Sequence, residues 1–139
     1  MKIATTTLSV ETHGKGLYPF TDQVTKWLAQ QSVAQGLLTL FILHTSASLV
    51  IQENADPDVI LDLRDFFERL VPAEVQSYRH TAEGPDDMTS HIRSTLTQSS
   101  LTVPVAEGKM TLGTWQGLYV FEHRARPHRR SVVAQFLGE

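Results

Sequence analysis

The chain has 139 residues, of which 41% are hydrophobic and 19% are charged, and its formal net charge is −3. This balance is typical of one folded domain and excludes a disordered chain. The charge gives no reason to expect nucleic acid as a partner, and the lack of cysteine excludes disulfides, thiol nucleophiles and thiolate metal ligands.

No segment of the sequence has the pattern of a targeting signal or a membrane span. The N-terminal residues 1–10 lack the apolar stretch of a signal peptide. The longest apolar run, 37–43, is too short to cross a bilayer. We therefore expect a cytoplasmic protein without a membrane partner.

The first third of the chain alternates between strand and helix patterns. Residues 2–12, rich in Thr, Val and Leu, predict an opening strand. Apolar residues at three- and four-residue steps over 20–34 predict an amphipathic helix that stops at Gly36. Residues 36–44 are apolar on both faces and predict a buried strand, and 49–51 predict a short one.

The middle of the chain predicts two more helices. One covers 56–70, with Asp56 as its cap and Pro57 in its first turn. The other begins near Pro85 and Asp86, and its apolar stripe consists of Met88, Ile92 and Leu96. An apolar stripe of this kind normally faces the core of the domain.

The last forty residues have strand patterns broken by glycine and Pro127. The predicted strands are 101–105, 109–113, 118–123 and 131–137. They predict a closing antiparallel meander and, with the three helices, an α+β fold with a mostly antiparallel sheet. We expect a single domain over 1–139.

Two histidines and two adjacent aspartates lie within the twelve residues from His80 to His91. They are His80, Asp86, Asp87 and His91. Imidazoles and carboxylates hold metal ions and exchange protons near neutral pH. Asp87 and His91 are four residues apart and share one face of the predicted helix. The alternative is that the two aspartates only favour the helix N-terminus and that His91 is a half-buried polar residue.

Other polar residues follow apolar strands. His44 ends a buried strand and precedes Thr45, Ser46 and Asn54, and Glu122 lies beside His123. Pockets often open where a strand ends. The alternative for His44 is a hydrogen bond to a backbone carbonyl.

A basic segment follows Glu122 and His123. Its members are Arg124, Arg126, His128, Arg129 and Arg130. Arginine binds phosphate and carboxylate in a bidentate manner, so this segment is a candidate phosphate clamp. The alternative is a solvated turn around Pro127.

The run SLTVPVAEGKMTLGTWQGL, Ser100 to Leu118, resembles the signature of the YjbQ family. The residues that match are Ser100, Val103, Val105, Gly108 and Gly113 to Gln116. The resemblance extends through HTSASLVIQENADPDV, DDMTSHI and FEHRARPHRR. In the predicted strand around the GTWQ block, Gln116 faces a ligand, and Trp115 lies in the core or a subunit interface.

The resemblance implies a compact α+β fold that assembles as a homotrimer. It also implies a cleft between subunits lined by His44, Asn54, His80, Asp87, His91, Gln116 and Glu122. Members of this family are described as secondary thiamine-phosphate synthases, so the resemblance implies a transferase that acts on phosphorylated small molecules.

These observations support three hypotheses. The first is a thiamine-phosphate-synthase-like enzyme, in which His44, His80 and His91 bind a divalent metal, and Arg124 and Arg130 hold phosphate. Its catalytic polar residues are Asp87, Glu122, Asn54 and Gln116. The metal is zinc if the imidazoles dominate and magnesium if carboxylates and phosphate do. The second is a metal- or small-anion-binding module without robust catalysis. The third is a structural protein whose polar clusters stabilise a trimer.

Overall fold

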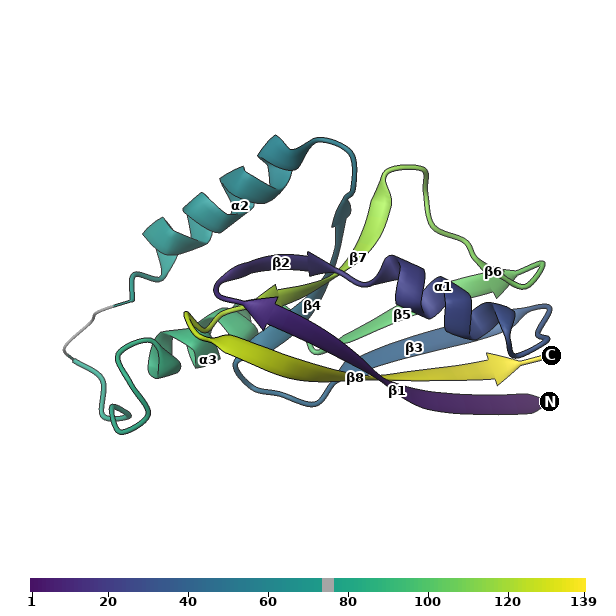
Figure 1. The fold of residues 1–139 in the computed structure, drawn as a ribbon, viewed down its shortest axis with the longest axis horizontal. Helices are drawn as coiled ribbons and strands as arrows, with labels where there is room; N and C mark the ends of the chain where they lie inside the picture. The colour runs from purple at the N-terminus through teal and green to yellow at the C-terminus, as the bar shows by residue number, and fades with distance from the viewer. Residues whose placement is uncertain (74–76) are drawn as a thin grey trace.

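Two antiparallel sheets form the framework of the protein (Figure 1). The structure is a computed structural model that describes residues 1–73 and 77–139. The five-stranded sheet has the order β1 (Lys2–His13), β8 (Pro127–Gly138), β3 (Gly36–Ile42), β5 (Ser100–Ala106) and β6 (Lys109–Met110). The three-stranded sheet has the order β2 (Gly16–Pro19), β7 (Gln116–Glu122) and β4 (Ala47–Glu53). The predicted α+β class with mostly antiparallel sheet is confirmed.

Three helices accompany the sheets, as predicted. They are α1 (Thr21–Ala29), α2 (Pro57–Leu70) and α3 (Asp87–Leu96). The α2 prediction holds in detail, because Asp56 accepts a hydrogen bond from the backbone of Asp58 and Pro57 occupies the first turn. In the described part of the chain, no helix is both long and apolar enough to cross a membrane.

Helix α1 is shorter than the predicted 20–34. It ends at Ala29, where the backbone N–H groups of Gln30 and Gln31 donate to carbonyls three residues back and Ser32 then takes a positive φ of 54°. Gly36 begins β3 instead of stopping the helix. A Cβ atom at Gly36 would collide with the Leu137 carbonyl and the Phe136 ring, so the close approach of β3 to β8 requires glycine.

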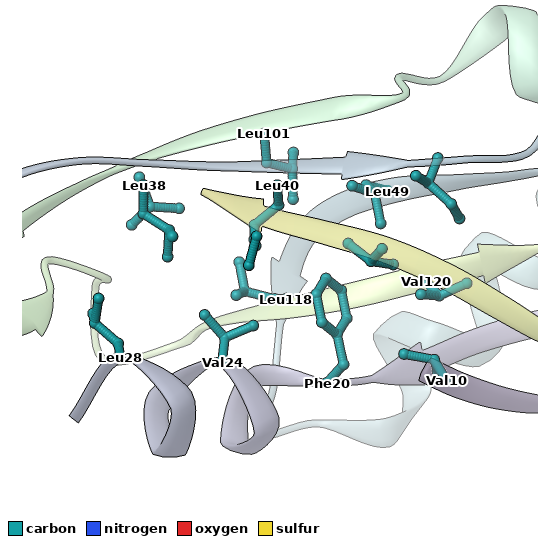
Figure 2. Close-up of a cluster of buried hydrophobic side chains, with 14 of the residues drawn as sticks. Val10, Phe20, Val24, Leu28, Leu38, Leu40, Leu49, Leu101, Leu118 and Val120 are labelled. Carbon is teal, nitrogen blue, oxygen red and sulfur yellow. The ribbon is translucent and has the colours of Figure 1, made fainter. Parts of the chain in front are cut away.

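The hydrophobic core lies between the two sheets and is closed by α1 (Figure 2). In Figure 2, Val24 and Leu28 of α1 point toward the side chains of the sheets. Leu38 and Leu40 contribute from β3, and Leu118 contributes from β7. The core side chains of β3 occupy alternate positions, because a strand presents successive residues to opposite faces.

The prediction that residues 36–44 are buried on both faces was wrong. The outward side chains Leu37, Phe41 and Leu43 are 49%, 46% and 53% exposed. Nothing in the described part of the chain covers this face of the sheet. The outer face of β3 is therefore apolar and open.

The predicted closing meander was also wrong. Strands β5 and β6 form a hairpin, but β7 crosses to the three-stranded sheet and β8 returns between β1 and β3. Pro127 does not break the chain but begins β8 opposite His13, at the end of the β1–β8 ladder. Proline is tolerated at the first residue of a strand.

The apolar side of α2 contacts the sheets only in part, through residues such as Phe67, whose ring centroid is 5.0 Å from that of Phe121 in β7, and the apolar stripe of α3 faces outward. No residue of α2 is fully buried, and Leu61, Phe66 and Leu70 are exposed. Figure 1 shows α2 projecting away from the two sheets. In α3 the polar residues Ser90 and Arg93 are buried, while Leu96 is 56% exposed. The predicted inward direction of the Met88–Ile92–Leu96 stripe was therefore wrong.

Candidate metal centre

Four side chains of types that can bind a metal ion converge at the start of α3. Their donor atoms, from His80, Glu83, Asp87 and His91, all lie within 4.8 Å of one another. Asp87 Oδ2 is 2.6 Å from His80 Nε2 and 3.0 Å from His91 Nε2. Glu83 Oε2 is 3.2 Å from the same nitrogen of His80. The sequence cluster at 80–91 is thus one compact group in space.

The backbone of the β3–β4 connection fixes the orientation of His91. Its Nδ1 lies 2.9 Å from the carbonyl oxygen of Thr45, which only accepts hydrogen bonds, so Nδ1 carries a proton. In the neutral ring, Nε2 then carries a lone pair that points at the Asp87 carboxylate. This arrangement is repulsive unless a proton or a metal ion lies between the two atoms. A carbonyl that holds the outer nitrogen is a usual support for a histidine ligand.

Arg124 holds the other side of the cluster. It donates from Nη1 to Asp87 Oδ1, from Nε to Asp86 Oδ2 at 3.2 Å, and from Nη2 to the Glu83 carbonyl at 2.9 Å. The backbone of Ala125 also donates to Asp86, at 2.7 Å. Arg124 was predicted to bind phosphate. In the structure its guanidinium positions Asp87 and the loop that carries Glu83.

The charges in the cluster favour ionised carboxylates. Burial opposes ionisation of Asp87, but the hydrogen bond from His80 and the charge of Arg124 outweigh it and lower the pKa of this carboxyl. Burial likewise opposes ionisation of Asp86, while the Ala125 N–H and Arg124 lower its pKa. The hydrogen bond to Asp87 raises the pKa of His80. Asp87 is therefore a charged carboxylate that lies between two imidazoles.

His44, Glu122 and Arg130 form a second, separate group. Glu122 is fully buried and accepts from Arg130 Nε at 2.7 Å, from Arg130 Nη2 and from Thr12 Oγ1 at 2.5 Å. His44 Nε2 accepts from the backbone of Ser131 at 2.8 Å, so this nitrogen is not free to bind a metal. His44 was predicted as a metal ligand, but the structure keeps it out of the His80–His91 cluster.

The buried ion pair with Glu122 occupies the guanidinium of Arg130. Its guanidinium was predicted to hold phosphate, yet it is 3% exposed and its charge is balanced by Glu122. Burial opposes ionisation of Glu122, but the hydrogen bonds from Arg130 and Thr12 lower its pKa. Thr12, near the end of β1, belongs to this buried group. The sequence did not identify it, because it is 110 residues from Glu122 in the chain.

Asn54 and Gln116 lie at the opposite end of the β4–β7 ladder from Glu122. Ala47 pairs with Glu122 at one end of this ladder and Glu53 pairs with Gln116 at the other. The six intervening steps span roughly 20 Å at about 3.4 Å per residue. Within one chain, the predicted pocket that unites Gln116 and Asn54 with the histidines is therefore not formed.

The GTWQ block is a turn rather than a ligand-facing strand. Gln116 Oε1 accepts from the backbone of Gly113 at 2.8 Å, and β7 begins only at Gln116. Trp115 lies in the loop and is 62% exposed, so the core alternative for this residue was wrong, and the subunit-interface alternative stays a prediction.

A buried histidine network lies beside the ion pair. His123 Nε2 is 2.9 Å from Ser48 Oγ, which accepts from Thr97 at 2.6 Å. Burial and the charges of Arg93 and Arg130 lower the pKa of His123 to about 3. The sequence showed His123 beside Glu122, but nothing local marks Ser48 or Thr97 as its neighbours.

The chain resembles known proteins over nearly its whole length. The family model described as "UPF0047 protein YjbQ-like" matches residues 6–139. A UPF0047 protein of Synechocystis sp. is 50% identical over 132 residues, which cover 95% of this chain and 90% of that protein. The UPF0047 protein YjbQ of Escherichia coli O157:H7 is 42% identical over 134 residues, which cover 96% of both chains.

Solved structures agree with the fold. A hypothetical protein from Aeropyrum pernix K1 has a TM-score of 0.88 and 27% identity, with coverage of 98% of this chain and 99% of that chain. An uncharacterized conserved protein of the YjbQ/UPF0047 family from Clostridium acetobutylicum has a TM-score of 0.86 and 33% identity, with coverage of 95% and 99%.

These comparisons overturn the predicted reaction. The similar proteins are described as UPF0047, hypothetical or uncharacterized proteins, and none of these descriptions supports thiamine phosphate synthesis or any transferase. The expectation of a thiamine-phosphate-synthase-like enzyme was wrong. The predicted family is confirmed by the match over residues 6–139 and by the identities of 42% and 50%. The chain belongs to the YjbQ-like UPF0047 family.

Proposed function

We propose that this protein binds one divalent transition-metal ion of the zinc class through His80, Asp87 and His91. The observation that carries the proposal is the shared oxygen Asp87 Oδ2, which faces the Nε2 atoms of both histidines at 2.6 and 3.0 Å. His91 presents a lone pair to that oxygen because its Nδ1 is held by Thr45. A bound cation would replace the proton shared by His80 and Asp87 and would remove the repulsion between His91 Nε2 and Asp87 Oδ2.

The geometry fits a tetrahedral ion after a small expansion. Ligand atoms about 2.0–2.1 Å from zinc are separated from one another by roughly 3.3 Å. The separations of 2.6 and 3.0 Å around Asp87 Oδ2 are about 0.7 and 0.3 Å smaller than this, and Glu83 Oε2, 3.2 Å from His80 Nε2, can supply a fourth ligand. Side-chain rotations of His80 and Glu83, which are both exposed, provide the expansion.

The donor set favours zinc over magnesium. Two imidazole nitrogens suit zinc and related ions, whereas magnesium takes oxygen ligands and retains water. Arg124 and Thr45 supply the outer hydrogen bonds that hold the ligand side chains. When bound, an ion with an open coordination position supplies Lewis-acid chemistry toward a ligand oxygen.

The proposed assembly is a homotrimer. The support for self-association is the apolar surface that one chain leaves open at Leu37 of β3 and at Leu61, Phe66 and Leu70 of α2, and the number three comes from the family resemblance. Monomeric proteins rarely expose contiguous apolar patches of this kind. Sedimentation equilibrium is expected to give three times the 15.6 kDa mass of one chain. A single-chain mass at micromolar concentration would exclude the trimer.

Calorimetric titration of chelator-treated protein with Zn²⁺ and with Mg²⁺ tests the metal site. We expect one Zn²⁺ per chain and at least 100-fold weaker Mg²⁺ binding. The variants Asp87→Asn and His91→Ala are expected to weaken Zn²⁺ binding by about 100-fold or more, because each loses a direct ligand. His13→Ala, at an exposed histidine outside the cluster, is the matched control and should bind as the unmodified chain does. Equal binding by His91→Ala and His13→Ala would refute the site.

A further inference from the structure

The hydrogen bonds of His44 determine which of its nitrogens carries a proton. The backbone N–H of Ser131 donates to His44 Nε2 at 2.8 Å, and a backbone amide can only donate. Nε2 is therefore an acceptor, and the imidazole proton must be on Nδ1. Burial and the nearby charge of Arg130 lower the pKa of His44, which agrees with a neutral ring.

His44 Nδ1 faces another donor instead of an acceptor. Arg130 Nη1 is 3.4 Å from it, and a guanidinium nitrogen has only N–H groups to offer. The remaining nitrogens of Arg130 are used, since Nε and Nη2 donate to Glu122 and Nη2 also reaches the Ser46 carbonyl at 3.2 Å. Two N–H groups thus converge in the described structure with no acceptor between them. Because Arg130 is 97% buried, such a gap is costly.

The gap adjoins the largest described pocket. His44 and Ser46, the two residues that Arg130 contacts on this side, both line an open pocket of about 750 Å³. Its described walls combine apolar side chains with hydroxyls and contain no carboxylate; they include Phe41, Ile42, Leu43, Thr45, Ser94 and Ser99. Ser94 Oγ is buried and makes no hydrogen bond with any described residue. The pocket therefore offers donors next to an apolar surface.

We propose that this pocket binds an uncharged organic molecule whose carbonyl-type oxygen accepts hydrogen bonds from His44 Nδ1–H and Arg130 Nη1–H together. One oxygen with two lone pairs satisfies both donors. The apolar part of the molecule lies against Phe41 and Leu43, whose side chains are half exposed beside the pocket. The proposed ligand residue His91 also lines this pocket, so the two sites adjoin, and the proposal is made for the metal-free protein.

Charge balance selects a neutral oxygen over an anion. The charge of Arg130 is already matched by the fully buried carboxylate of Glu122, so the pair offers no net positive charge. An anion would lose its hydration beside this carboxylate without gaining a free cation. A carbonyl oxygen makes the same two hydrogen bonds at a much smaller desolvation cost. The site therefore discriminates between amide and carboxylate groups of similar shape.

Nitrogen-15 NMR of the full chain, treated with chelator, tests this proposal. The His44 ring is expected to show the Nδ1–H tautomer. N-methylacetamide should shift the His44 Nδ1 and Arg130 side-chain signals saturably, with a dissociation constant on the order of 1–10 mM, as expected for so small a fragment. Acetate at the same ionic strength should bind at least fivefold more weakly.

Variants locate the binding and define the contrary outcomes. His44→Phe removes the imidazole donor and should abolish the saturable shifts, while Arg129→Ala, at the exposed neighbour that pairs with Glu11, should not change them. The wild-type measurements stand even if His44→Phe fails to fold. An Nε2–H tautomer, acetate binding as strong as amide binding, or a fixed water that saturating amide does not displace would each overturn the proposal.

Discussion

Replacing Glu122 by glutamine is expected to lower the free energy of unfolding by about 3 kcal/mol or more, because it leaves the charge of buried Arg130 uncompensated. The glutamine NH₂ would also face the donors of Arg130 and Thr12, which now converge on the carboxylate. In a chain of 139 residues this loss corresponds to a fall in melting temperature of roughly 10 °C. Urea unfolding followed by circular dichroism measures the effect directly.

The exposed ion pair between Glu11 and Arg129 gives a matched control. Their side chains are 65% and 73% exposed and 3.2 Å apart. Glu11→Gln should cost no more than about 1 kcal/mol, because solvent screens an exposed pair. If Glu122→Gln were no more destabilising than Glu11→Gln at equal protein concentration, the reasoning on the buried pair would be refuted.

The pH dependence of stability provides a second test of the Glu122–Arg130 pair. The pKa of Glu122 is lower in the folded than in the unfolded state, so at acidic pH the unfolded chain binds more protons. The stability that Glu122 contributes is present above its unfolded pKa and is lost as the pH falls through the folded pKa. Glu122→Gln should therefore lose less stability than the unmodified chain on acidification from neutral pH.

Two further substitutions test how neighbouring groups position the site and the core. Arg124→Met should weaken Zn²⁺ binding by roughly 10- to 100-fold through misplacement of Asp87 and leave the one-to-one stoichiometry intact; unchanged affinity in calorimetry would remove its positioning role. Gly36→Ala should destabilise the fold by about 1–3 kcal/mol, because its Cβ meets the Leu137 carbonyl and Phe136. Gly113→Ala, which meets only the Gln116 side chain, is the control in urea unfolding, and equal losses would contradict the close-approach argument.

The part of the site that is local in sequence was predictable. Asp87 and His91 lie four residues apart on a helix, and this spacing alone places them on one face. Glu83 lies between His80 and Asp87 in the sequence, but it is in a loop, and a loop has no periodicity from which the direction of its side chain could be predicted. The Thr45 carbonyl that orients His91 comes from 46 residues away and is a backbone group, so no side-chain pattern could identify it.

The errors in the fold have a common physical origin. Periodicity predicts that an element has two unlike faces, but it does not determine which face packs on the chain's own core. Strand β3 is apolar on both faces, yet only the side of Leu38 and Leu40 is buried. The location of His44 depended on the pairing of β3 with β8, a partner about 90 residues away. Local patterns do not encode such pairings.

Helix α3 connects the candidate metal centre with the proposed assembly. Its inward face is polar, and two of its buried side chains are held by hydrogen bonds: Arg93 Nη2 donates to the Val71 carbonyl at 2.8 Å and Ser90 Oγ donates to the Asp87 carbonyl at 2.5 Å. The Ser90 bond lies within the helix, and the Arg93 bond ties α3 to the end of α2, where apolar packing would normally hold a helix. They fix the first turn of α3, where Asp87 faces the histidines. Because the polar face is directed inward, Leu96 and the apolar side of the helix point outward. The same rotation that builds the ligand cluster therefore creates an apolar surface, which a trimer would bury.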